Sequence, residues 1–167
     1  MTSWFPRYSV TRSPVQQKPE LAVIGTFGTM FGPSPERELR RAHDSGLVVV
    51  LATSSPMEEL EYLRRVIDAD DAIDAVTTAD DVGASKPDPE VFVKAMASAG
   101  IDPDRALAIG DSKWDVQAAR AAGIGCVGVE TGGFSQHELA EAGALRIYSD
   151  VNELSQQFFT SPLAVLL

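Results

Sequence analysis

The stretch that decides the fold is LAIGDSKWDVQAARAAG, residues 107–123. It begins as a short apolar run and breaks at Gly110. Apolar residues then recur at spacings of three, from Val116 onward. A short apolar run followed by a helical period predicts a buried strand that leads through a sharp turn into a helix.

Two carboxylates, Asp111 and Asp115, lie at this turn, four residues apart. That spacing predicts two side chains on one face of a helical turn. Asp111 would lie at the carboxyl end of the strand, where open α/β sheets bind ligands, and paired carboxylates suit Mg²⁺. Asp and Ser are also ordinary N-cap residues. The segment alone therefore leaves a metal site and a plain helix start equally open.

Length and composition restrict the class of protein. The 167 residues suffice for one domain with a sizeable core. The net charge of −10 disfavours nucleic acid and anionic membrane surfaces as partners. No apolar run has the length of a membrane span, and the first residues lack the apolar centre of a secretory signal. The single cysteine lies in an apolar run and is expected to be a buried thiol. We therefore expect a cytoplasmic protein.

Strand and helix patterns alternate along the chain with short connections. Strands are predicted at residues 21–24, 47–52, 73–78, 106–109, 126–130 and 145–148, with helical patterns between and after them. This alternation predicts an α/β fold, a parallel sheet with helices on both faces. Residues 1–20, which are rich in proline, are expected to form an arm or tail, residues 21–159 the core domain, and residues 160–167 a C-terminal tail.

Polar side chains follow several of the predicted strands. Thr53 and Ser54 end the apolar run LVVVLA, and Lys86 lies in the extended segment GASKPDPEVF. Because the carboxyl ends of parallel strands share one edge, we expect these residues to meet Asp111 and Asp115 there. A lone lysine more often faces solvent, so Lys86 alone carries little weight.

Residues 47–150 resemble the haloacid dehalogenase (HAD) superfamily, in its phosphatase and phosphomutase branch. The matching pieces are LVVVLATSS, GASKPDPEVF, ALAIGDSKWDVQAARAAGI and VGVETGG, in the family's order. The resemblance implies a three-layer, Rossmann-like sheet. It also implies an Mg²⁺-dependent phosphohydrolase that passes through an aspartyl-phosphate.

The resemblance assigns a role to each matching residue. Thr53, with Ser54 beside it, takes the place of the hydroxyl that hydrogen-bonds the phosphate. Lys86 matches the lysine that neutralises the phosphate and steadies the nucleophile. Asp111 matches the metal-binding aspartate, and Asp115 matches its acidic supporter.

The first family motif, D-x-D-G-T, is altered in this chain. The corresponding stretch is LAVIGTFGTMFG, in which Gly28 and Thr29 match the final G-T. Gly25 stands where the nucleophilic aspartate belongs, and Phe27 stands where the acid/base aspartate belongs. Glycine has no side chain to attack phosphorus, and phenylalanine cannot transfer a proton. The loss of a carboxylate also predicts weaker Mg²⁺ binding.

The chain also departs from the family in length. Members of this branch carry a helical cap domain between the first motif and the hydroxyl-bearing strand. Only about two dozen residues separate Gly28 from Thr53, which suffice for one helix with its turns. The resemblance therefore predicts a capless domain with an open site.

Three interpretations remain open from the sequence. The first is a HAD-fold binding or interaction module without catalytic aspartates, which holds a small phosphorylated metabolite or another anion with weakly bound Mg²⁺, or binds a protein partner or a second copy. The second is an active phosphatase that uses another nucleophile. The third is a truncated or engineered core whose site residues have no function.

Overall fold

The computed structural model describes residues 22–26 and 35–166. The predicted N-terminal arm and the altered motif from Phe27 onward lie outside the described residues. No helix in the described ranges is long and apolar enough to cross a membrane.

Six parallel strands form a single sheet in the order β3-β2-β1-β4-β5-β6. The strands are β1 (Ala22–Thr26), β2 (Val48–Ala52), β3 (Ala75–Thr77), β4 (Ala106–Gly110), β5 (Gly125–Val129) and β6 (Arg146–Tyr148). The chain order reverses direction between β1 and β4, which is the switch point where open α/β sheets bind ligands. The predicted parallel α/β architecture is thereby confirmed.

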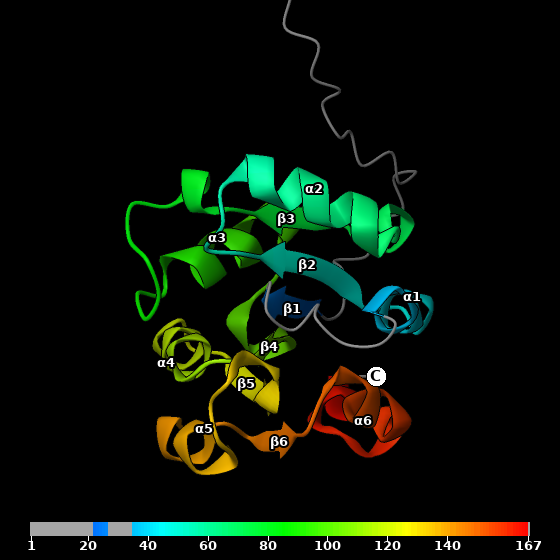
Figure 1. The fold of residues 1–167 in the computed structure, drawn as a ribbon, viewed down its shortest axis with the longest axis vertical. Helices are drawn as coiled ribbons and strands as arrows, with labels where there is room; N and C mark the ends of the chain where they lie inside the picture. Colours follow the sequence, from blue (N-terminus) through cyan, green and yellow to red (C-terminus); the bar gives the residue numbers. More distant parts are fainter. Residues whose placement is uncertain (1–21, 27–34, 167) are drawn as a thin grey trace, which may run out of the picture.

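Helices cover both faces of the sheet, as Figure 1 shows: α3, α4 and α5 lie on one side, and α1 and α6 lie on the other. The helices are α1 (Pro35–Asp44), α2 (Met57–Ile67), α3 (Glu90–Ala99), α4 (Lys113–Ala121), α5 (Gln136–Ala142) and α6 (Val151–Gln156). Short 3₁₀ turns occupy Asp70–Ala72, Ala79–Asp81, Pro103–Arg105, Glu130–Gly132, Phe158–Thr160 and Pro162–Leu166.

The apolar run of β2 shows why three layers form. Successive side chains of a strand point to opposite faces. Val48 and Val50 accordingly join the cluster beneath α3, α4 and α5, whereas Val49 and Leu51 join the cluster beneath α1, α2 and α6. All five residues of β2 are buried, as expected of a central parallel strand.

The C-terminal residues belong partly to the core. Leu163 is buried in the cluster beneath α1, α2 and α6. Arg41 of α1 holds this end of the chain, because its Nη1 donates to the carbonyl oxygen and to Oγ of Ser155, each at 2.9 Å. The Arg41 guanidinium also lies 5.5 Å from the centroid of the Phe158 ring. Within the predicted C-terminal tail, Ser161 and Leu163 are buried, whereas Thr160 and Val165 are exposed.

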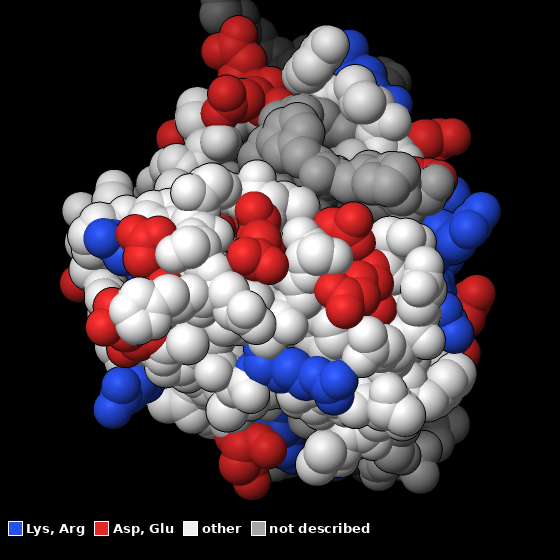
Figure 2. Space-filling view, turned by 60° about the horizontal axis from the view of Figure 1, so that its bottom comes forward, with Lys and Arg blue, Asp and Glu red and all other residues white. Residues whose placement is uncertain are grey.

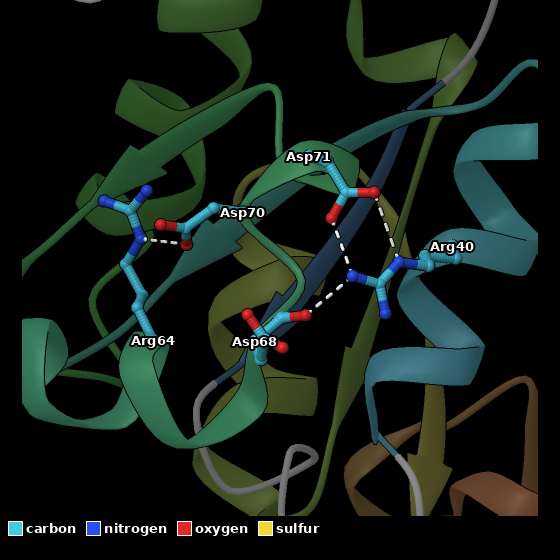
Figure 3. A network of polar contacts seen from close by, with 5 residues as sticks. All are labelled: Arg40, Arg64, Asp68, Asp70 and Asp71. Atoms are coloured by element: carbon cyan, nitrogen blue, oxygen red, sulfur yellow. Dashed lines mark hydrogen bonds and ion pairs between the residues drawn. The ribbon is translucent and has the colours of Figure 1, made fainter.

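A surface network ties α1 to the turn that follows α2 (Figure 3). Arg40 Nη2 donates to Asp71 Oδ1 at 2.8 Å and to the carbonyl of Asp68 at 2.7 Å, and Arg64 Nε lies 2.8 Å from Asp70 Oδ1. The hydrogen bond from Arg40 holds the pKa of Asp71 below its usual value. Because these pairs face solvent, they add little to stability.

Acidic side chains outnumber basic ones in the sequence, 24 to 14. On the face shown in Figure 2 the carboxylates form several separate groups rather than one continuous patch. On this face the lysine and arginine side chains also form no continuous basic patch (Figure 2).

Candidate phosphate and metal site

The candidate site lies at the carboxyl edge of the sheet, around the ends of β1, β2 and β4. Gly25 of β1 stands in register with Leu51 of β2 and with Ile109 of β4. Thr53 directly follows β2, and Asp111 directly follows β4. The position that the family resemblance gives to the nucleophile is therefore flanked by the strands that carry the other site residues.

Thr53 is fixed by the backbone and keeps its hydroxyl hydrogen available. Its N–H donates to the carbonyl of Thr77 at 2.9 Å, which extends the pairing of β2 with β3 by one residue. Its Oγ1 accepts from the N–H of Ser55 at 3.0 Å, and its side chain is 1 % exposed. Within the described residues this hydroxyl donates to no other group, so it can donate to a ligand oxygen.

Ser54 and Lys86 line a small, open hollow. Ser85 adds a second hydroxyl, and Val82 and Val91 form part of the apolar wall. Hydroxyl and ammonium donors around a small hollow suit a phosphate group. Two of the three residues expected to bind phosphate, Ser54 and Lys86, thus line the same hollow, and Thr53 directly precedes Ser54 in the chain. Their role toward phosphate stays a prediction.

Lys86 and Asp115, which the sequence predicts to lie at the same edge of the sheet, form a buried ion pair. Lys86 Nζ lies 2.7 Å from Asp115 Oδ1, and their side chains are 10 % and 4 % exposed. The ammonium also lies 5.5 Å from the centroid of the Phe92 ring. A lysine buried in this way is held in position by its carboxylate, since breaking such a pair leaves an uncompensated charge.

The carboxylate of Asp115 also begins α4. Its Oδ2 accepts from the N–H of Ser112 at 3.0 Å and from Ser112 Oγ at 2.7 Å, while the Asp115 N–H donates back to Ser112 Oγ. This is a capping box with Asp in place of the usual Glu. The metal-site interpretation and the helix-start interpretation of this segment therefore describe the same side chains. Both carboxylate oxygens of Asp115 are thus engaged, Oδ1 by Lys86 and Oδ2 by Ser112, and its role as an acidic support of a metal stays a prediction.

Asp111 is not on the helix, because α4 begins at Lys113. The two carboxylates nevertheless interact. Burial, followed by the negative charge of Asp115, raises the pKa of Asp111 from 3.8 to about 6. A partly buried carboxylate next to a second one is stabilised in its charged form by a nearby cation.

Gly132 packs directly against Asp111. A Cβ at Gly132 would lie 2.2 Å from the carbonyl oxygen and 2.7 Å from Cγ of Asp111. No larger residue fits there without displacing Asp111. The Gly132-Gly133 pair after β5 was the sequence signal for this close approach. The sequence alone indicated only a turn there.

The donor set around Asp111 fits a weakly held Mg²⁺. No group of three or more His, Cys, Asp or Glu side chains in the described ranges converges on a metal position. Mg²⁺ does not need such a group, since it keeps several waters and often binds through one or two carboxylates plus ligand phosphate oxygens. Asp111, with its partly desolvated carboxylate, is the residue that would hold the ion.

Comparison with known proteins agrees with this geometry. The family profile described as haloacid dehalogenase-like hydrolase matches residues 12–123. This chain belongs to the haloacid dehalogenase-like hydrolase family. A phosphoglycolate phosphatase of Salmonella paratyphi A is 34 % identical over 135 residues, which cover 78 % of this chain and 52 % of that protein.

Solved structures of the family have the same fold. A hydrolase from Pseudomonas syringae superimposes with a TM-score of 0.72 at 33 % identity, over 77 % of this chain and 60 % of that one. CbbY from Rhodobacter sphaeroides, solved in complex with phosphate, gives a TM-score of 0.64 at 29 % identity, over 73 % of this chain and 55 % of that one. The chain thus spans about half the length of the curated relative.

Proposed function

We propose that this HAD-like domain binds phosphate and small phosphorylated metabolites, together with weakly held Mg²⁺, and has little or no phosphatase activity of its own. The observation that carries the proposal is the buried Lys86 ammonium, 2.7 Å from Asp115 Oδ1, on the hollow that Ser54 also lines. These residues can hold a phosphate. Gly25, in contrast, brings no side chain to the end of β1.

Each retained residue contributes a separate part of binding. Thr53 and Ser54 offer hydroxyl donors to phosphate oxygens, and Lys86 offers a charge-assisted hydrogen bond, the stronger kind. Asp111 would hold Mg²⁺, which when bound supplies positive charge to a phosphate oxygen. Covalent catalysis would in addition need a nucleophile and a proton donor. Residues 25 and 27 supply neither.

Active phosphatase is the second candidate, and the identity to a phosphoglycolate phosphatase favours it. It requires an acidic side chain other than those of the first motif to reach the phosphorus atom. The two candidates differ in one measurable property, because both bind phosphate but only the second turns a phosphomonoester over.

The binding site is tested by calorimetric titration of the protein with inorganic phosphate in Mg²⁺ buffer. Lys86→Met alone would leave Asp115 buried without its cation, so the double variant Lys86→Met/Asp115→Asn is used. We expect it to weaken phosphate binding about tenfold, the value of one hydrogen bond to a charged group. The exposed Lys94 provides the control variant Lys94→Met, which should bind as the wild type does. Equal affinity in the wild type and the double variant, or no binding by the wild type, would contradict the proposal.

A further inference from the structure

A cluster of one cation and two aromatic rings lies beside the candidate site. The Nζ atom of Lys113 lies 4.8 Å from the centroid of the Trp114 ring and 5.6 Å from the centroid of the Phe134 ring. We call these three residues the Lys113 cluster. None of them was singled out by the family motifs, and none belongs to the phosphate hollow.

Both segments that carry the Lys113 cluster lie close to Asp111. Lys113 and Trp114 open α4, two and three residues after Asp111. Phe134 comes two residues after Gly132, whose α-carbon packs so closely that an added Cβ would lie 2.7 Å from Asp111 Cγ. The cluster therefore lies next to the metal-binding position, on the side that α4 and the turn after β5 form.

Lys113 differs from the other two lysines in the described part of the chain. Lys86 and Lys94 each have a carboxylate within ion-pair distance, at 2.7 and 3.1 Å, whereas no carboxylate of residues 22–26 or 35–166 forms such a pair with Lys113. The hydrogen bonds that Glu138 Oε2 accepts from Ser135 N and Oγ lower the pKa of Glu138, and the positive charge of Lys113 contributes to this shift. In a chain with a net charge of −10, an ammonium held by rings rather than by a carboxylate is available for an anionic ligand.

The aromatic rings restrict where that ammonium can lie. A cation over two ring faces is held electrostatically, so less side-chain entropy is lost when a ligand binds to it. Trp114 is 43 % exposed, and a large ring exposed beside a ligand site offers contact area to the bound molecule. The Lys113 cluster therefore presents an ammonium group in a restricted position, bordered by the aromatic rings of Trp114 and Phe134.

We propose that the Lys113 cluster is a second subsite, which binds an anionic group at the far end of the phosphorylated ligand. This inference rests on the proposed phosphate site at Lys86 and names its ligand class, a small phosphomonoester that carries a second anionic group. The second anion accepts from Lys113 Nζ, and Trp114 and Phe134 border its connecting carbons.

A matched pair of ligands tests the subsite by calorimetric titration of the full chain in Mg²⁺ buffer. Phosphoglycolate ends in a carboxylate, and 2-hydroxyethyl phosphate has the same length with a neutral end. We expect the wild type to bind phosphoglycolate about fivefold more tightly, the upper range for an ion pair near solvent. Lys113→Met should abolish this preference, Lys113→Arg should retain most of it, and Lys94→Met should leave it unchanged.

The outcomes separate this inference from the proposed function. A preference that persists in Lys113→Met, or no preference in the wild type, overturns the subsite while phosphate binding through Lys86 still stands. Failure of the wild type to bind either ligand overturns both. Binding of 2-hydroxyethyl phosphate should be equal in the wild type and in Lys113→Met, and an equal loss for both ligands would show a general structural defect and overturn the subsite.

Discussion

At the residue scale, the raised pKa of the candidate metal ligand Asp111 makes the stability of the protein depend on pH. Its folded-state pKa of about 6 lies above the usual 3.8 because of burial and the charge of Asp115. The folded state therefore binds the proton more tightly than the unfolded state does between these two pH values. Stability consequently falls as the pH rises from about 4 through 6, and the deficit persists above pH 6.

The variant Asp111→Asn removes this penalty. In buffer that contains a metal chelator, we expect it to be more stable than the wild type above pH 6, by about 1–2 kcal/mol after allowance for partial exposure. Near pH 4 the two proteins should be equally stable. Chemical denaturation at several pH values measures the difference, and the exposed Asp104 provides the control variant Asp104→Asn. A wild type that gains stability over Asp111→Asn as the pH rises from 4 to 7 would refute the assignment.

Gly132 allows a second test of the same position. Because a Cβ would meet the Asp111 carbonyl at 2.2 Å, Gly132→Ala should cost about 1–3 kcal/mol of stability, as overpacked sites do. Gly83→Ala is the control, because there the nearest atom lies 3.6 Å away and the change should be small. Thermal unfolding of both variants checks the prediction. If both behave alike, the close approach of Gly132 to Asp111 is wrong.

At the element scale, the strands were predictable and the details of the site were not. Short apolar runs that end in Gly, Thr or Asp placed β2 and β4 to within a residue, because a buried parallel strand has no polar face to interrupt the run. The spacing argument placed Asp111 and Asp115 on one helical face, but α4 begins only at Lys113. Their side chains interact because the turn brings them together, and not because of helical periodicity.

The sequence predicted that Lys86 and Asp115 lie at the same edge of the sheet, but it did not predict their direct ion pair. The two residues are 29 positions apart, and each had a local explanation, an extended pre-proline lysine and a helix cap. Only the crossover from α3 to β4 and α4 brings them within 2.7 Å. The Lys113 cluster was missed because Phe134 belongs to another loop, although Lys113 and Trp114 are adjacent in the quoted stretch.

The attachment of the C-terminal segment to α1 yields a prediction at the same scale. Arg41→Met removes two hydrogen bonds to Ser155 and the guanidinium over Phe158. We expect a loss of about 1–2 kcal/mol in the free energy of unfolding. Amide exchange should rise over α6 and the residues after it. The control is Arg37→Met on the exposed side of α1; a loss as large in Arg37→Met would mean that Arg41 has no special role.

At the scale of the whole molecule, the described ranges form a six-stranded parallel sheet, and we propose that its carboxyl edge binds an anion. The segment between β1 and β2 contains one described helix, α1, where the family resemblance leads one to expect a cap. An edge without a cap exposes the ligand to water, which weakens every electrostatic contribution to catalysis. Phosphate binding, the function that we propose, does not depend on such exclusion of water.

Turnover of an aryl phosphate in Mg²⁺ buffer is the measurement that tests the central claim most directly. The account predicts that the wild type stays at the background rate, because no carboxylate at residue 25 or 27 attacks phosphorus or transfers a proton. The variant Gly25→Asp/Phe27→Asp should in contrast show measurable Mg²⁺-dependent turnover. Robust turnover by the wild type that Asp111→Ala abolishes would contradict the account.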